Sequence, residues 1–209
     1  MQPDDREELA AWRAGDRGAG KALFERHYGA VARFFRNKAG DAWAELTQRT
    51  FLALLETLPR YRGDGTFRGY LFGIAYRQLL RHYRERARDR DRLDFGTVSA
   101  ADLDPSPSAV VGEREHEQVL LRCLRRLPLD YQVILELHYW EDMSARECGE
   151  ALDLPLGTAK TRLRRGRQLL ERELTAIASG QDALTRTSTR LDEWARALRA
   201  RALPDTDGS

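Results

Sequence analysis

A cluster of positive side chains between positions 156 and 172 is the first feature of this sequence that points to chemistry. Six basic residues face one acid there: Lys160, Arg162, Arg164, Arg165, Arg167 and Arg172, against Glu171. Basic side chains neutralise phosphates, and arginine also reads guanine edges. The cluster therefore predicts a nucleic-acid surface. Only three of the 35 Lys and Arg residues are lysine, so a general arginine bias, or a merely solvated basic helix, is the alternative.

The residues around this cluster predict a helix-turn-helix that presents it. Ser144, with Glu147 three positions later, makes a capping box that starts a helix. That helix ends before Pro155, because proline is poorly tolerated inside a helix. A second helix begins near Leu156 and runs past Leu170, with its apolar residues at steps of three and four. A basic second helix behind a tight turn is how such motifs enter the DNA major groove.

A second basic stretch lies between positions 60 and 90, where nine arginines face three acids. After a glycine-containing loop, a helix is expected over residues 67–88. It carries an arginine stripe and, on another side, an aromatic stripe: Arg77, Arg81, Arg84 and Arg88, then Phe72, Tyr76 and Tyr83. This combination suits single-stranded DNA, because cations follow phosphates while each ring stacked on an unpaired base contributes about 1–3 kcal/mol. Packing against neighbouring helices is the alternative for each ring.

Composition limits the classes of function. The 209 residues are 33% charged and 42% hydrophobic with a formal net charge of +2, so positive charge is local rather than global. Many apolar residues at helical spacing predict an all-α protein. Two isolated cysteines, Cys123 and Cys148, predict a reduced, cytoplasmic protein with no metal site or cofactor. The acidic N-terminus and the lack of a long apolar run predict neither a signal peptide nor membrane insertion.

The pattern divides the chain into two small helical bundles joined by a linker. The first bundle is expected over residues 1–90 and the second, which contains the helix-turn-helix, over residues 113–178. Between them, residues 91–112 lose the helical period and are rich in Gly, Ser, Pro and Asp, which predicts a flexible acidic linker. Residues 179–209 form a C-terminal extension that packs on the second bundle, binds a partner or is disordered.

Four sequence blocks resemble extracytoplasmic-function (ECF) sigma factors of the sigma-70 family, the small promoter-recognition subunits of bacterial RNA polymerase. The Leu-Pro at 127–128 and residues 152–167 are similar to the C-terminal domain of that family. Residues 45–51, Glu-Leu-Thr-Gln-Arg-Thr-Phe, and residues 67–75, Phe-Arg-Gly-Tyr-Leu-Phe-Gly-Ile-Ala, resemble motifs of its N-terminal domain. The blocks occur in the family's order, and the resemblance covers about residues 7–177.

The resemblance implies which residues meet each partner. One set would bind the clamp of core RNA polymerase: Glu45, Leu46, Gln48, Arg49 and Phe51. A second set would bind the −10 promoter element: Arg62, Phe67, Tyr70, Tyr76, Arg77, Arg81 and Arg84. A third set would bind the −35 element of promoter DNA: Thr158, Lys160, Thr161, Arg162, Arg164, Arg165 and Arg167. Within this set, Arg162 and Arg167 would contact phosphates. An anti-sigma factor of unknown identity is a further implied partner.

The function predicted from these features is promoter recognition as a subunit of RNA polymerase. A free-standing helix-turn-helix regulator is the alternative, and the block at 45–51 argues against it. An enzyme is not expected, because the sequence offers no nucleophile beside a base, no Gly-rich phosphate loop and no metal cluster. Arg49, Tyr70 and Arg77 stand where the family usually has an acid, a tryptophan and an asparagine. The promoter sequence and the inducing signal stay open.

Overall fold

The described part of the chain is helical. The computed structural model describes residues 5–61, 63, 65–86, 93–103 and 115–177. Within them lie helices α1 (Asp5–Arg13), α2 (Arg17–Arg36), α3 (Trp43–Thr57), α4 (Phe67–Arg86), α5 (Ala100–Leu103), α6 (Glu115–Arg126), α7 (Leu129–Tyr139), α8 (Ala145–Leu152) and α9 (Leu156–Ile177), with 3-10 turns η1 (Gly40–Ala42) and η2 (Leu58–Arg60). None of these helices is long and apolar enough to cross a lipid bilayer. The extension at 179–209 lies outside the described residues.

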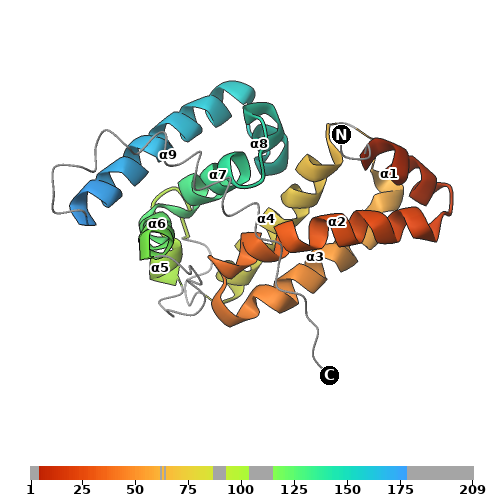
Figure 1. The fold of residues 1–209 in the computed structure, drawn as a ribbon, viewed down its shortest axis with the longest axis horizontal. Helices are drawn as coiled ribbons and strands as arrows, with labels where there is room; N and C mark the ends of the chain where they lie inside the picture. The colour runs from red at the N-terminus through yellow and green to blue at the C-terminus, as the bar shows by residue number, and fades with distance from the viewer. Residues whose placement is uncertain (1–4, 62, 64, 87–92, 104–114, 178–209) are drawn as a thin grey trace.

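The helices form two groups, which confirms the all-α fold with two bundles (Figure 1). The first group, α1 to α4, surrounds an aromatic and aliphatic core. Phe72 and Tyr83 of α4 are fully buried in it, and the Tyr83 hydroxyl donates to the Lys38 carbonyl. For these two rings the alternative, packing against neighbouring helices, is therefore confirmed. The helical period is right, but α2 and α3 cover that side of α4.

The second group, α6 to α9, contains the predicted helix-turn-helix. The Ser144 side chain accepts a hydrogen bond from the Glu147 backbone N–H at 3.2 Å, and the Glu147 carboxylate accepts one from the Ser144 N–H at 2.7 Å. The capping box is thus confirmed. Asp153 takes the left-handed conformation (φ 54°) and ends α8. A Cβ on Gly149 would lie 2.8 Å from the Leu154 carbonyl oxygen, so the tight turn requires glycine there.

Part of the predicted linker is ordered and packed. Within residues 93–103, Phe95 and Ala100 are buried, and the Phe95 carbonyl accepts a hydrogen bond from the Asp130 N–H at 3.1 Å. This stretch, which includes the short helix α5, lies between α4 and α6 in the chain and contacts the end of α4 and the start of α7. The expectation of a flexible spacer is wrong for this stretch, because the side chains of Phe95 and Ala100 are buried in the hydrophobic core. The rest of the predicted linker lies outside the described residues.

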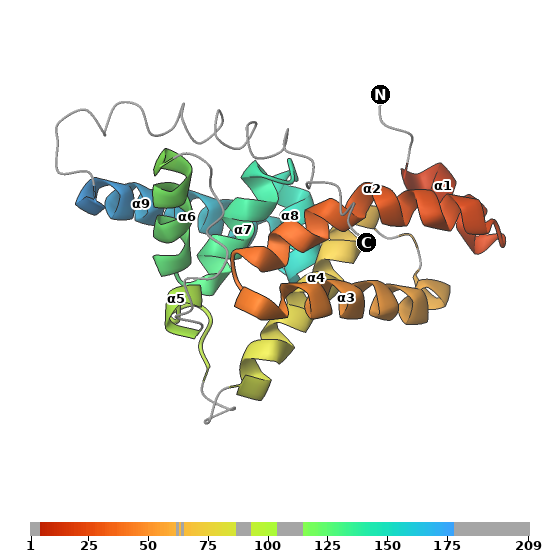
Figure 2. The same ribbon diagram turned by 60° about the horizontal axis from the view of Figure 1, so that its bottom comes forward.

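The two groups also pack against each other. Helices α4 and α8 lie side by side when the molecule is seen from either of two directions (Figures 1 and 2). No local pattern predicted this contact, because the residues that form it come from distant parts of the chain. It covers the side of α4 that carries Gly69 and Gly73.

Candidate nucleic-acid interface

The helix α9 exposes one half of its surface. Its apolar residues, including Ala159 and Leu163, are buried against the second bundle. Six of the seven residues predicted to meet the −35 element are exposed on the other half: Thr158, Lys160, Thr161, Arg164, Arg165 and Arg167. A shallow hollow of about 300 Å³ lies between Tyr131 at the start of α7 and the Thr158, Thr161 and Arg165 side of α9. Hydroxyl and guanidinium donors therefore surround a space that is open to solvent.

Arg162 differs from its neighbours on α9. Its guanidinium lies 2.9 Å from a carboxylate oxygen of Asp130 on α7, and the side chain is only 22% exposed. The other oxygen of Asp130 accepts a hydrogen bond from the Tyr76 hydroxyl of α4 at 2.8 Å. Burial, and then the Asp130 charge, raise the pKa of the Tyr76 phenol, which keeps it protonated as a donor. One carboxylate thus joins a predicted −35 residue to a predicted −10 residue.

The arginines predicted to meet the −10 element are exposed along α4, apart from Arg62, which lies outside the described residues. Arg77 is exposed, Arg81 pairs with Glu85 at 2.7 Å, and the Arg84 guanidinium lies 5.5 Å from the Phe95 ring centre. The Arg81–Glu85 pair is a surface pair on one helix, which a phosphate can displace at little cost. Solvent therefore reaches all three cationic side chains.

The predicted −10 rings are held within the protein to different degrees. Phe67 is buried in the first bundle. Tyr70 is half-buried, stacks on Tyr61 at 4.3 Å between ring centres, and donates a hydrogen bond to the Thr57 hydroxyl at 2.6 Å. Tyr76 is tied to Asp130. Each ring would have to leave a contact of its own to stack on a base.

The predicted polymerase-binding set spans the core and the surface of α3. Glu45, Gln48 and Arg49 are exposed, and the first pairs with the last at 2.6 Å. Leu46 and Phe51 are buried in the first bundle. The set therefore contains three exposed polar or charged residues that can contact a partner and two apolar residues that are buried beneath them.

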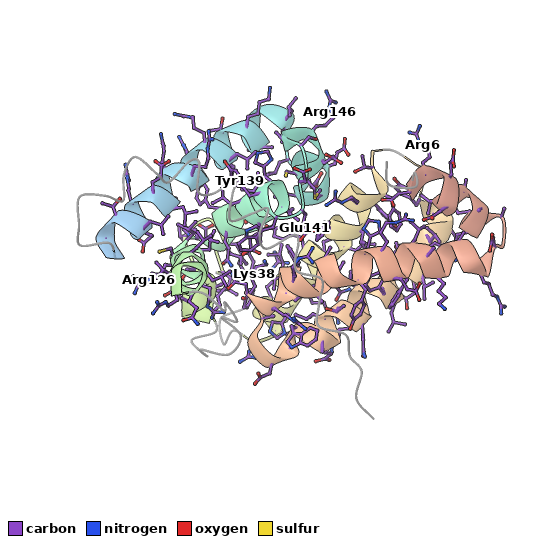
Figure 3. The ribbon with its side chains drawn as sticks, viewed as in Figure 1. Arg6, Lys38, Arg126, Tyr139, Glu141 and Arg146 are labelled. Atoms are coloured by element: carbon purple, nitrogen blue, oxygen red, sulfur yellow. The ribbon has the colours of Figure 1, made fainter. Side chains whose placement is uncertain are left out.

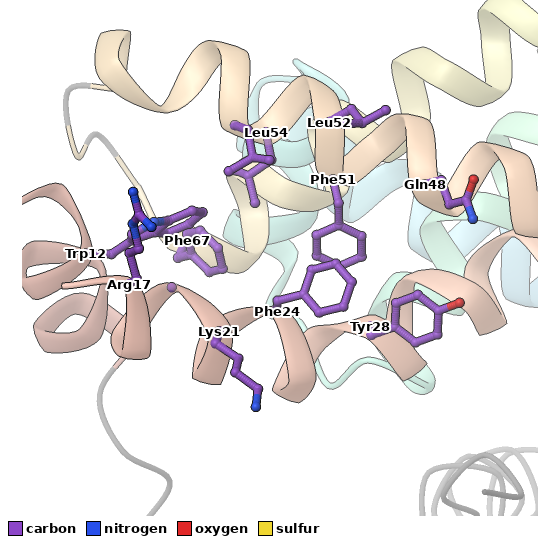
Figure 4. A pocket seen from close by; sticks show the side chains of 12 residues that line it. Trp12, Arg17, Lys21, Phe24, Tyr28, Gln48, Phe51, Leu52, Leu54 and Phe67 are labelled. Carbon is purple, nitrogen blue, oxygen red and sulfur yellow. The ribbon is translucent and has the colours of Figure 1, made fainter. Parts of the chain in front are cut away.

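Sequence reasoning missed an apolar groove beside this set. It has a volume of about 520 Å³ and lies between α2 and α3, where the Phe24 ring stands against Phe51 with 4.4 Å between centres (Figure 4). Phe24, Leu52 and Leu55 are 43%, 59% and 54% exposed. These three apolar side chains are therefore accessible to solvent. The spacing of Leu52 and Leu55, three residues apart on the helix, was the signal of a second apolar face.

Comparison with known proteins identifies the family to which this architecture belongs. Residues 23–89 match the family Sigma-70 region 2, and residues 117–170 match Sigma-70, region 4. The chain is 32% identical over 138 residues to the ECF RNA polymerase sigma factor SigE of Mycolicibacterium smegmatis, an alignment that spans 65% of this chain and 52% of that protein. The chain belongs to the ECF group of the sigma-70 family. The free-standing regulator is thereby set aside.

Further relatives of this sigma factor match over most of their length. The ECF RNA polymerase sigma-E factor of Haemophilus influenzae is 24% identical over 174 residues, covering 78% of this chain and 91% of that one. The sigma-E factor of Escherichia coli K12 is 23% identical over 173 residues, covering 78% and 90%. In contrast, the chain spans only about half the length of the mycobacterial relative. The predicted domain limits at 1–90 and 113–178 contain both family matches but remain predictions.

Solved sigma-factor structures share the fold. CnrH, in complex with the cytosolic domain of CnrY, superposes with a TM-score of 0.61 at 24% identity, covering 82% of this chain and 97% of that one. The sigma factor RpoE of Bartonella quintana, in complex with the anti-sigma factor NepR, gives a TM-score of 0.58 at 20% identity, covering 74% and 96%. At these identities the likeness establishes the fold alone.

Proposed function

We propose that this sigma factor directs core RNA polymerase to promoters through three separate surfaces. The exposed half of α9 reads the −35 element, α4 and the loop before it hold the −10 strand, and α3 docks on the polymerase clamp. The protein acts in the cytoplasm by binding rather than by catalysis. The exposed basic half of α9, in a helix-turn-helix with a complete capping box, is the observation that carries the proposal.

The chemistry of α9 suits base reading in duplex DNA. The second helix of such a motif places its N-terminal residues against base edges in the major groove. Lys160 and Arg165 are exposed there, and either can bind the two acceptors on guanine. Thr158 and Thr161 carry hydroxyls that bond to bases or phosphates. Arg167, farther along the helix, is assigned to phosphate, as is Arg162 once it leaves Asp130.

The groove beside α3 supports a protein partner. Its exposed Phe24, Leu52 and Leu55 supply the apolar centre of an interface, and Glu45 and Arg49 supply a charged rim. A regulator that binds duplex DNA alone needs no such surface. We assign the groove to the clamp of core polymerase and extend the polymerase contact beyond the block at 45–51.

An inhibitory protein partner is part of this proposal. Two sigma factors of the same fold were solved with protein partners, the cytosolic domain of CnrY and the anti-sigma factor NepR. We infer that an anti-sigma factor, of unidentified sequence, also binds this chain. The apolar groove is accessible to it in the free protein.

In vitro transcription with core polymerase, followed by mapping of the start sites, tests the proposed function. We expect the protein alone to bind duplex promoter DNA weakly and to direct initiation once core polymerase is added. Leu52→Lys should weaken the association with core polymerase, whereas Glu56→Lys, on an exposed position of the same helix outside the groove lining, should not. Tight sequence-specific binding by the protein alone, with no response to core polymerase, would support the free-standing regulator instead.

A further inference from the structure

The apolar groove between α2 and α3 has two different ends. At one end the Trp12 ring of α1 lies on Gly20, where a Cβ would be 2.5 Å from that ring. At the opposite end Tyr28 and Gln48 place a hydroxyl and an amide beside the apolar lining (Figure 4). The groove is therefore closed by α1 on one side and ends in polar groups on the other.

Aromatic side chains line the middle of the groove. The ring centre of Phe24 lies 4.4 Å from that of Phe51 and 5.4 Å from that of Tyr28, and the last two are 6.1 Å apart. The exposed side chains of Leu52 and Leu55 stand beside these rings. A cluster with such spacings can accept a further ring in an offset or edge-to-face arrangement. The groove therefore suits an occupant that offers one aromatic ring between aliphatic side chains.

The surface between the two bundles is already filled, in contrast to the groove. A polar seam lies there, formed by Arg33, Lys38, Glu136 and Glu141. The Lys38 ammonium pairs with the Glu136 carboxylate, and the two side chains are 0% and 2% exposed. One Arg33 nitrogen donates to both carboxylate oxygens of Glu141, at 3.1 and 3.2 Å. Figure 3 shows Lys38 and Glu141 between the bundles. Among the described residues, nothing covers the groove in a comparable way.

The sequence beyond the described residues contains a stretch with the composition that the groove suits. Leu191, Trp194 and Leu198 follow one another at steps of three and four, so in a helix they share one face. From the first to the last of them a helix rises about 10 Å, which equals the rise of α3 between Gln48 and Leu55. An amphipathic helix in an apolar groove, with anchors at these spacings, is a common mode of peptide recognition.

The polar groups of this stretch match those around the groove. A buried tryptophan needs an acceptor for its indole N–H, and the side chains of Tyr28 and Gln48 carry oxygen acceptors at the polar end. Residues 184–202 contain five arginines and two acids. The exposed acids Glu25 and Glu45 belong to surface ion pairs on α2 and α3, which exchange partners at little cost.

The chain between α9 and this stretch is long enough to reach the groove. The last described residue is Ile177, at the end of α9 that points away from α1 (Figure 1). Residues 178–190 can span up to about 45 Å when extended. The whole of α2, which forms one wall of the groove, is 20 residues and therefore about 30 Å long. Docking within one molecule is thus compatible with the length of the connection.

We propose that residues 184–202, the tail segment, dock as a helix in the groove of the same molecule, with Trp194 against the rings of Phe24, Tyr28 and Phe51. A tether of this length holds the segment at an effective concentration on the order of 1 mM. A weak contact therefore fills the groove, and a protein partner of higher affinity displaces it. Docking itself depends only on the groove, whereas competition with core polymerase rests on the proposed function.

Photo-crosslinking from position 194 tests where the tail segment lies. Full-length protein with benzoylphenylalanine in place of Trp194 is irradiated without polymerase, and the linked peptides are identified by mass spectrometry. We expect adducts on α2 and α3 near Phe24 and Phe51 in the monomeric protein, and their loss when Leu52→Lys places a charge in the groove. Adducts on the second bundle, adducts only between two copies of the chain, or no adducts would overturn the proposal.

Binding to core polymerase gives a second readout in the opposite direction. Trp194→Glu should empty the groove and increase the affinity for core polymerase at least about threefold, the factor expected if the tail segment fills two thirds of the grooves. Ala200→Glu adds the same charge away from the apolar face of the segment and should behave as the wild type. Misfolding does not produce a gain in affinity. Equal, measurable affinities of Trp194→Glu and the wild type would contradict the proposal.

The two proposals fail in different ways. If neither the wild type nor Trp194→Glu binds core polymerase, the proposed function is overturned, and adducts on α2 and α3 still support docking of the tail segment. If the wild type directs initiation with core polymerase but gives no adducts on α2 and α3, docking is overturned and the proposed function stands.

Discussion

The two basic helices of this sigma factor are of similar length, 20 residues in α4 and 22 in α9, but they are exposed differently. The polar half of α9 faces solvent along its length. On α4 the arginines are exposed, while the side that carries Gly69, Gly73 and Tyr76 faces the other bundle. The basic side chains of α9 are thus accessible without any rearrangement of the described residues. If Tyr76 of α4 binds a DNA strand, it has to leave Asp130 of the other bundle first.

The position of small residues explains this difference. On α9 the small residues Ala159 and Gly166 face its own bundle, where a Cβ on Gly166 would lie 3.2 Å from the Leu135 side chain. On α4 the glycines face α8 of the other bundle. Small residues thus allow close packing within one bundle on α9 and between the two bundles on α4.

Among the substitutions considered, Lys38→Met should have the largest effect on the packing between the two bundles. It leaves the Glu136 carboxylate buried without its ammonium, which costs the packed arrangement of the two bundles about 3–5 kcal/mol. We expect the bundles to separate, seen as a larger radius of gyration in X-ray scattering and a lower urea midpoint. Lys21→Met is the control, because its pair with Glu25 is largely exposed and should matter by less than about 1 kcal/mol. A compact Lys38→Met protein with wild-type stability would show that the seam does not hold α4 under α8.

Alanine at Lys160 or Arg165 tests the open helix. If one of them reads a guanine, its loss should cost about 1–3 kcal/mol of promoter binding and relax specificity at one −35 position. The measurement is binding of the polymerase complex to a set of promoters with single −35 substitutions. Alanine at both positions with an unchanged −35 preference would remove α9 from base reading.

Two replacements of Tyr76 separate its contact with Asp130 from its contact with DNA. Tyr76→Phe keeps the ring and loses a hydrogen bond worth about 0.5–1.5 kcal/mol, so we expect an easier separation of the bundles with normal open-complex formation. Tyr76→Ala should leave closed-complex binding nearly intact and impair strand opening, and a pre-melted −10 template should restore activity in part. If Tyr76→Ala lowers thermal stability and the melted template does not help, the ring is part of the packing between the bundles.

Arg81→Ala should have the smallest effect. Arg81 is exposed and pairs only with Glu85 in the described part of α4, so its role would be to neutralise one phosphate. We expect weaker promoter binding regardless of base sequence and a salt dependence whose logarithmic slope falls by about 1. A sequence-dependent loss with an unchanged salt slope would contradict the phosphate assignment.

Local signals account for the parts of the fold that were predicted correctly. The helix-turn-helix depends on Ser144, Glu147 and Pro155, whose effects act within a few residues of the chain. The exposed half of α9 follows from its own apolar period. The helical spacing was predicted correctly, but the helices that pack on each face were not. Phe72 and Tyr83 are covered by other helices, whereas Leu55 is not. A helical pattern states which residues share a face, and the packing of other helices determines whether that face is buried.

The sequence by itself determined the helices, the turn and the two basic clusters, because each depends on residues that are close along the chain. The tertiary structure decided which side chains beside those clusters are covered. Lys38 and Glu136, 98 positions apart, meet in the seam, and Gly73 matters only because Ala151 lies against it. Neither pair carries a sequence signal, since a buried charge looks like a surface charge until its partner is placed. The free energy of packing between the two bundles is therefore a property of the assembled molecule. The sequence of either bundle alone does not reveal it.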